Sequence, residues 1–276
     1  MGRWCGVVAV LAACGGPSPA PSAATQSSAV PPVAQAVMPP SARPLSLEAL
    51  EALVNAASRT EADREADRRR KPVQMLEFLG VFEGMSVADI GAGTGYTTEL
   101  LARAVGPSGR VIGHNTPFVL DFYAERPWTQ RLSKPEMADV VRVDRPFDDP
   151  LGREHTGLDA AINVLFYHDF VWQEVDRVAH NRAMFAALRP GGSYVVIDAH
   201  AAKGDGTTVT KTLHRIERSV LIEEVTAAGF VLADEADFLR NLNDTRDWNA
   251  LPTRSGREEF SDKFVLLFEK PAPSSR

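Results

Sequence analysis

Cysteine is scarce in this chain of 276 residues, and positive charge is not in excess. The two cysteines, Cys5 and Cys14, lie near the N-terminus, so the remaining residues can form neither a disulfide bond nor a thiolate metal site. Lys and Arg total 30 against 36 Asp and Glu, which gives a net charge of −6. This balance favours an acidic, solvated surface over a basic one, and we expect no nucleic-acid partner.

Metal-ligand spacing and long apolar runs are missing as well. None of the six histidines pairs with another at metal-ligand spacing beside supporting Cys or carboxylate residues, so we predict no metal site. The apolar stretch at residues 5–13 is too short to span a bilayer as a helix. We therefore expect contact with a membrane only through an attached anchor.

The N-terminal residues have the order of a targeting segment. A short basic start at residues 1–4 leads into the apolar stretch, which ends in L-A-A-C at residues 11–14. This order resembles a bacterial lipoprotein signal peptide, which implies that residues 1–14 direct export and that Cys14 carries the lipid. We expect a protein anchored to a membrane facing the periplasm. In lipoproteins, an aspartate directly after the lipidated cysteine favours the inner membrane. Gly15 occupies that position here, which slightly favours the outer membrane. An ordinary secretory leader or a chance apolar N-terminus is the alternative.

The rest of the chain divides by composition into three parts. Residues 15–44 are rich in Pro, Ser, Ala and Gly and are predicted as a disordered tether. Residues 45–71 are predicted as a helical N-terminal segment with Ser46 as the N-cap. The charged residues 61–71 are typical of a solvated helix face, with a lid over a neighbouring cleft as the alternative. Residues 72–271 form the predicted folded domain.

Three glycines at alternate positions follow a short apolar run and predict a ligand-binding turn. Residues 85–90 are predicted as a buried strand and residues 97–105 as a helix, with Gly91, Gly93 and Gly95 between them. Without Cβ atoms the backbone lets a ligand approach closely, and free N–H groups open the helix. This order predicts a cofactor site at the carboxyl end of the strand.

The spacing of these glycines distinguishes between cofactors. A dinucleotide fingerprint, G-x-G-x-x-G, would need its third glycine where Tyr96 stands, which disfavours a dehydrogenase. The pattern D-x-G-x-G-x-G from Asp89 to Gly95 instead resembles motif I of class I S-adenosylmethionine-dependent methyltransferases. A second resemblance to that family is the helix, L-R-P-G-G turn and strand expected within residues 171–198. The order of D-R-R-R-K-P, G-A-G-T-G-Y, D-A-H-A-A, L-H-R-I and D-K-F-V also resembles predicted bacterial methyltransferases that often carry export signals.

The resemblance implies an α/β, Rossmann-like class I methyltransferase fold. Such a fold has a seven-stranded, mostly parallel sheet with helices on both faces and a C-terminal antiparallel strand pair. We expect one long helix at residues 171–188 and a loop at residues 240–257 that covers the substrate cleft. The apolar runs supply seven strands, expected at residues 85–90, 110–115, 140–144, 158–167, 193–198, 230–234 and 264–269.

The resemblance also implies S-adenosylmethionine as the cofactor. Asp89 would help to hold the amino group of its methionine part. Most members place Asp or Glu at the end of the second strand to accept the ribose hydroxyls, but Asn115 stands here, with fewer acceptor sites and no charge. Asp144 would lie near the adenine amino group, or it is an exposed strand-end residue without a ligand. The residues expected at the cofactor are Asp89, Gly91, Gly93, Gly95, Tyr96, Asn115 and Asp144.

Acceptor chemistry is expected where the fourth and fifth strands end, because the family places the transferable methyl group there. His168 and Asp169 follow the fourth strand, and His200 follows the fifth. An imidazole can act as a base near neutral pH, with Asp169 or Asp198 as an orienting partner. We predict His168, Asp169 and His200 as catalytic residues and His214 as a further histidine of interest. For each histidine, a structural hydrogen bond is the alternative.

These observations predict a methyltransferase that acts on a small molecule or an envelope component. The alternative is a non-catalytic, lipid-anchored binding module that keeps the fold. Asp89 and the three glycines favour the enzyme, whereas Asn115 favours the binding module. The residues leave the oligomeric state open.

Overall fold

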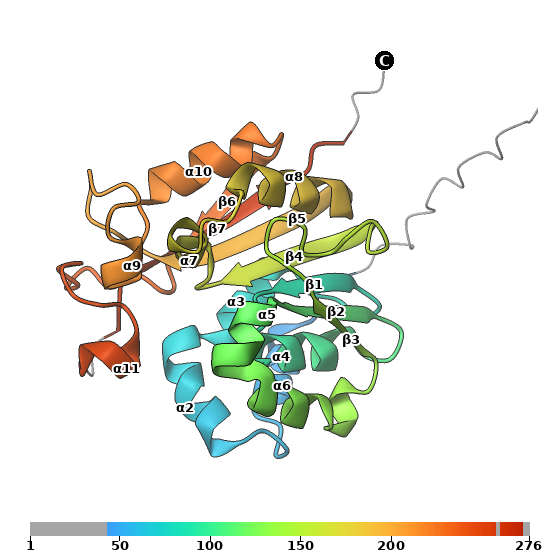
Figure 1. The fold of residues 1–276 in the computed structure, drawn as a ribbon. Coiled ribbons are helices and arrows are strands. Elements are labelled where there is room, and N and C mark those ends of the chain that lie inside the picture. The colour runs from blue at the N-terminus through green and yellow to red at the C-terminus, as the bar shows by residue number, and fades with distance from the viewer. Residues whose placement is uncertain (1–42, 258–259, 273–276) are drawn as a thin grey trace, which may run out of the picture. The chain divides into compact units, whose positions relative to one another are not determined.

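The structure is a computed structural model that describes residues 43–257 and 260–272. Their backbone forms one mixed sheet of seven strands with helices on both sides (Figure 1). The expectations for the leader, for Cys14 and for the tether up to residue 42 lie outside these residues. The strands in chain order are β1 (Ser86–Ile90), β2 (Arg110–Asn115), β3 (Val140–Asp144), β4 (Leu158–Val164), β5 (Leu188–Ala199), β6 (Val231–Ala236) and β7 (Lys263–Glu269).

The strands lie in the order β3-β2-β1-β4-β5-β7-β6. Neighbours among β1 to β5 are parallel, while β7 runs antiparallel between β5 and β6. The predicted seven-stranded sheet with its C-terminal antiparallel pair is confirmed. The strand order reverses between β1 and β4, and open α/β sheets bind ligands outside the carboxyl ends of strands at such a point.

Helices cover both faces of this sheet. In Figure 1, α8 and α10 lie on one side and α4 and α6 on the other. Val87 and Ala88, neighbours in β1, belong to two different buried apolar clusters, as expected for a sheet covered on both faces. No helix within 43–257 and 260–272 is long and apolar enough to cross a bilayer. The helices are α1 (Leu47–Val54), α2 (Glu61–Arg70), α3 (Pro72–Leu79), α4 (Tyr96–Val105), α5 (Pro117–Val119), η1 (Leu120–Ala124), α6 (Glu125–Leu132), η2 (Pro135–Met137), α7 (Tyr167–Trp172), α8 (Arg177–Ala187), α9 (Thr210–Leu213), α10 (Arg218–Ala227) and α11 (Pro252–Ser255).

The N-terminal segment consists of two helices, because a second cap starts α2. Ser46 caps α1 as predicted, by accepting a hydrogen bond from the amide of Ala49. Thr60 caps α2 by accepting from the amide of Asp63, whose carboxylate in turn accepts from the Thr60 amide. This reciprocal capping box fixes a helix start inside a stretch whose composition is helical throughout.

The single helix predicted at residues 171–188 is wrong, since α7 and α8 take its place. Between them Glu174 adopts a left-handed conformation with φ of 55°, which ends the helical path. Asp176 then caps α8 by accepting from the amide of Ala179. The apolar periodicity of the sequence continues from α7 into α8, so it does not indicate that one helix ends and another begins.

The strands whose ends differ most from the prediction are β4 and β5. β4 ends at Val164, so that His168 and Asp169 lie in the first turn of α7. β5 starts at Leu188, which pairs with Leu158 of β4, so the L-R-P-G-G segment belongs to the strand. Because β4 ends earlier than predicted, the first turn of α7 sets the direction of the His168 and Asp169 side chains.

Candidate active site

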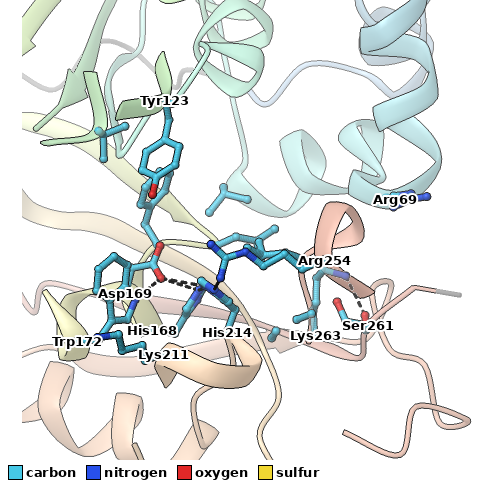
Figure 2. A pocket seen from close by; sticks show the side chains of 18 of the residues that line it. Arg69, Tyr123, His168, Asp169, Trp172, Lys211, His214, Arg254, Ser261 and Lys263 are labelled. Carbon is cyan, nitrogen blue, oxygen red and sulfur yellow. Dashed lines mark hydrogen bonds and ion pairs between the residues drawn. The ribbon is translucent and has the colours of Figure 1, made fainter. Parts of the chain in front are cut away.

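A cavity of about 610 Å³ opens at the carboxyl ends of the central strands (Figure 2). This volume is typical of a site for a cofactor or a small molecule. As predicted, the loop at residues 240–257 contributes to its wall, through Trp248 and Arg254. Distant parts of the chain therefore share one site, among them Arg70 of α2, Gly93 after β1 and His168 of α7.

Of the three glycines after β1, only Gly93 lines the cavity. A Cβ atom on Gly91 would lie 2.7 Å from the ring of Phe166, and one on Gly95 would lie 2.4 Å from the ring of Trp128. A Cβ on Gly93 would have nothing closer than 3.9 Å, although its φ of +56° disfavours side chains. Gly91 and Gly95 are thus required by internal packing, and Gly93 presents backbone to the cavity.

Asn115 at the end of β2 is fully buried and binds the same glycine. Its Oδ1 accepts a hydrogen bond from the Gly93 amide at 2.8 Å, and its Nδ2 donates to the Gly93 carbonyl at 3.0 Å. The amide thus satisfies both backbone groups of one residue, which a carboxylate could not do. Asn115 is absent from the residues that line the cavity, and its role visible in the structure is to hold the glycine loop.

Asp89 and Tyr96 also face other protein groups. Asp89 is buried and accepts a hydrogen bond from the Thr98 hydroxyl at 2.6 Å. Burial raises the pKa of the Asp89 carboxyl to about 6, although Thr98 and the charge of Arg70 lower it. The Tyr96 hydroxyl donates to Asp67 of α2. Neither Asp89 nor Tyr96 is among the cavity-lining residues.

Asp144 lies away from the cavity, at the end of the edge strand β3. Its carboxylate pairs with Arg142 at 2.8 Å, and its side chain is 36% exposed. The sequence-based position near an adenine would place it in the lining, but the cavity opens at β1, β4 and β5 instead. The structure therefore does not bring Asp144 together with Gly93.

His168 is the central polar residue on the opposite wall. Its Nδ1 lies 2.7 Å from Asp198 Oδ1, and Asp198 also accepts hydrogen bonds from the backbone amides of His168 and Ala199. Asp198 is thus the orienting partner, one of the two that the sequence suggested. Burial lowers the pKa of His168, but Asp198 and Asp169 outweigh it and raise the value to about 10.

Asp169 and His214 complete a cluster beside His168. His168 Nε2 lies 3.0 Å from Asp169 Oδ1 and 3.2 Å from His214 Nδ1. Trp172 donates its indole N–H to Asp169 at 2.7 Å. His168, Asp169, Trp172 and His214 all line the cavity (Figure 2). His214 lies 46 residues beyond His168, so no local spacing could have indicated their contact.

The structure separates His200 from this cluster. Its ring packs at 5.0 Å from the ring of Phe264, and it is absent from the cavity lining. Burial lowers its pKa to about 4, although Asp262 opposes this effect. Of the three predicted catalytic residues, the structure brings together His168 and Asp169.

Cationic side chains dominate the charged residues of the lining. None of them was predicted as a site residue, although Arg69 and Arg70 belong to the charged run for which a lid over a neighbouring cleft was the alternative to a solvated helix face. In the structure Arg70 packs its guanidinium 4.8 Å from the centre of the Tyr96 ring. Among the described residues the lining includes one carboxylate, Asp169. The cations that line the cavity are Arg69, Arg70, Lys211, Arg254 and Lys263.

Comparisons with known proteins agree with this architecture. The family model of protein-L-isoaspartate(D-aspartate) O-methyltransferase matches residues 44–127, which include the glycine loop. A Myxococcus xanthus relative named ribosomal RNA large subunit methyltransferase E is 33% identical over 147 residues, and the match covers 49% of this chain and 65% of the relative.

Two solved structures share the fold. An S-adenosylmethionine-dependent methyltransferase from Aquifex aeolicus is 12% identical with a TM-score of 0.53, covering 82% of this chain and 99% of its own. A chain from a Haloferax volcanii complex between the Trm112 methyltransferase activator and a methyltransferase is 15% identical with a TM-score of 0.51, covering 83% and 100%. The chain has the fold of these proteins, and the family match supports a class I methyltransferase.

Proposed function

We propose that this protein transfers a methyl group from S-adenosylmethionine to a small-molecule or envelope acceptor. The observation that carries the proposal is one cavity that joins Gly93 of a class I glycine loop to the cluster of His168, Asp169 and His214. The family match over residues 44–127 and the methyltransferase fold support this cofactor. Bound there, it supplies an activated methyl group on a sulfonium.

The residues around the glycine loop fit this cofactor at its methionine end. Gly93 and Thr94 line the cavity, and Gly93 has no side chain that would occupy it. Arg70 supplies a positive charge on the same wall, which suits the carboxylate of the cofactor's methionine part. Asp89 and Asn115 support this site by fixing the strand end and the loop through Thr98 and Gly93.

The opposite wall is suited to an acceptor that carries negative charge or loses a proton. Lys211 and Lys263 lie on the cavity and attract an anionic group. The carboxylate of Asp198 orients the His168 ring, whose Nε2 points into the polar cluster. His168 and Asp169 are therefore our proposed acceptor-side residues, with His214 beside them. His200 is left out because it packs against Phe264.

A binding module without catalysis is not favoured by the comparisons, which point to methyltransferases. Asn115 was the feature that favoured it. Since this amide satisfies both backbone groups of Gly93, its presence has a structural reason that does not require loss of activity.

Calorimetric titration of the purified protein with S-adenosylhomocysteine tests the cofactor site. We expect binding that Arg70→Ala weakens at least tenfold, because the positive charge that faces the carboxylate of the cofactor's methionine part is lost. Arg68→Ala is the matched control, since this residue of the same helix has a side chain 71% exposed and should leave affinity unchanged. Absence of binding to the folded protein would exclude the proposed function.

The cellular location is part of the proposal and rests on residues 1–14 alone. We propose export and lipidation at Cys14, because the L-A-A-C segment follows a basic start and an apolar stretch. Cys14→Ser should release the protein from the membrane to the soluble fraction of cells. Membrane association that persists in this variant would contradict the anchor.

A further inference from the structure

We propose that His168, Asp169 and His214 bind a divalent transition-metal ion at the wall of the cavity. The three residues come from the first turn of α7 and from the C-cap of α9. The spacing along the chain gave no reason to expect a metal, because the fold alone brings His214 to the other two. The metal site is independent of the proposed cofactor site at Gly93.

The distances between the three ligand atoms match those around a metal. His168 Nε2 and Asp169 Oδ1 are 3.0 Å apart, His168 Nε2 and His214 Nδ1 are 3.2 Å apart, and His214 Nδ1 and Asp169 Oδ1 are 3.3 Å apart. An ion with bonds of about 2.1 Å in octahedral or tetrahedral geometry holds its ligand atoms about 3.0 to 3.4 Å apart. The three atoms therefore form one face of such a coordination shell.

Hydrogen bonds from outside the cluster hold two of the ligands. Asp198 occupies Nδ1 of His168, so Nε2, which faces the cluster, is the nitrogen that would bind a metal, with the ion displacing its proton. This carboxylate, histidine and metal arrangement is common in metalloproteins because it fixes ring orientation and raises ligand basicity. Trp172 fixes Asp169 in the same way, through its indole N–H.

The backbone and burial of the cluster also suit a metal centre. His214 has a φ of 52°, a left-handed conformation that is uncommon outside glycine and concentrates at functional sites. The side chains of His168, His214 and Asp169 are 2%, 8% and 15% exposed. The negative charges of Asp169 and Asp198 lie next to the ion position and would offset its charge.

Positive side chains near the cluster limit what else can complete the shell. Arg254 Nη1 lies 3.4 Å from His214 Nε2, a nitrogen that would carry the proton once Nδ1 binds a metal, so Arg254 would have to turn away. Lys211 and Lys263 line the same cavity. These cations favour an anionic or ionisable group on the open positions of the metal, such as a hydroxyl that becomes an alkoxide or phenolate.

The donor set indicates the class of metal. Two imidazole nitrogens and one carboxylate oxygen suit Zn²⁺, Fe²⁺ or Co²⁺ better than Mg²⁺ or Ca²⁺, which prefer oxygen ligands. An ion at this position would lower the pKa of a bound hydroxyl and orient it in the cavity. That consequence for methyl transfer rests on the proposed function, whereas metal binding itself does not.

Titration with Co²⁺ tests the site directly, because its visible absorption reports nitrogen and oxygen ligation. The protein should be purified without a polyhistidine tag and freed of metal with a chelator. We expect one bound ion per chain, with affinity reduced at least tenfold in both His214→Ala and Asp169→Asn. His155→Ala is the matched control, because His155 contacts Arg110 and lies outside the cavity lining.

Two results would overturn the proposal. One is the absence of Co²⁺ absorption bands in the folded wild-type protein, and the other is an unchanged titration in His214→Ala and Asp169→Asn. Circular dichroism establishes that each variant is folded, and competition with Zn²⁺ should remove the Co²⁺ bands if the site prefers zinc. S-adenosylhomocysteine binding, measured on the same samples, reports on the proposed function separately.

Discussion

At the scale of single residues, the position that departs from the class I methyltransferase pattern has a local structural reason. Asn115 stands where an acid is usual, and its amide donates to and accepts from Gly93. Sequence alone indicated that this position mattered, but it could not show the partner, which lies 22 residues away. The same holds for His168, whose orienting Asp198 was one of two options until the fold was known.

Asn115→Asp should destabilise the protein and weaken cofactor binding, although it restores the residue type that is usual in the family. A carboxylate can accept from the Gly93 amide but faces the Gly93 carbonyl with a second oxygen, which we expect to cost about 1–3 kcal/mol. Urea unfolding and titration with S-adenosylhomocysteine measure the two effects. Asn243→Asp, on the exposed surface, is the control. Tighter binding at unchanged stability would instead mean that residue 115 contacts the ligand.

His114→Gln should reduce the loss of stability on acidification. His114 is fully buried; its Nδ1 accepts from the Gly91 amide and its Nε2 faces the carbonyl of Arg145. Burial lowers its pKa from 6.5 to about 3, although the hydrogen bond to Arg145 opposes this. Below pH 6.5 the unfolded chain binds a proton at this histidine, whereas the folded protein does not bind it until the pH approaches 3. The stability that is present above pH 6.5 is therefore lost as the pH falls towards 3.

The size of this loss of stability follows from the difference between the pKa of His114 in the folded and in the unfolded protein. One such histidine lowers the free energy of unfolding by roughly 1.4 kcal/mol per pH unit below 6.5, or about 2 kcal/mol between pH 7 and pH 5. Urea unfolding at both pH values, for wild type and His114→Gln, isolates this residue because the other groups contribute to both. Equal pH dependence in the two proteins would show that His114 is not the source.

At the scale of elements, the strands were predictable and the helix ends were not. Apolar runs indicated the central strands, since buried parallel strands are apolar throughout. The exposed edge strand β6 was expected from the C-terminal antiparallel pair that the resemblance implied. The break between α7 and α8 depends on Glu174 in a left-handed conformation, which periodicity does not reveal. The role of α2 depended on tertiary partners as well. Asp67 of α2 accepts a hydrogen bond from Tyr96 of α4, and Asp63 pairs with Arg131 of α6, so the solvated face that the sequence suggested holds for only part of the helix.

Arg131→Met should detach α2 and lower the free energy of unfolding by on the order of 3 kcal/mol. Arg131 pairs with Asp63 of α2 and with Glu99 of α4, whose side chains are 4% and 1% exposed, and it donates to the Thr94 carbonyl. Removing it leaves buried carboxylates short of a partner, which is strongly destabilising. Urea unfolding measures the loss. Arg126→Met, exposed on the same helix, should change stability by less than about 0.5 kcal/mol, and an equal effect of both would refute this role.

At the scale of the whole molecule, the N-terminal helical segment belongs to the compact unit that the structure describes. The sequence placed a boundary after residue 71, where composition changes from charged to apolar. In the structure the amide of Leu45 donates to the carbonyl of Val81, and Leu50 and Val54 of α1 are buried in the same apolar cluster as Leu100 of α4. Composition could locate the charged run but not the partners of its neighbours, because these contacts form only when α1 lies beside α3 and α4.

Removing residues 1–71 should therefore unfold the domain, whereas removing residues 1–42 should leave it folded. Burial of Leu50 and Val54 contributes roughly 1.5–3 kcal/mol each, and the pairing of Asp63 with Arg131 adds to this, against a total stability of about 5–15 kcal/mol for a typical domain. Thermal unfolding followed by circular dichroism separates the two truncations. If the shorter chain melted at the same temperature as the longer one, the helices α1 and α2 would be an appendage, and the wall that Arg70 gives to the cavity would be dispensable for the fold. A loss of cooperative melting only in the shorter chain would mean that the segment before residue 72 is part of the core on which the cavity is built.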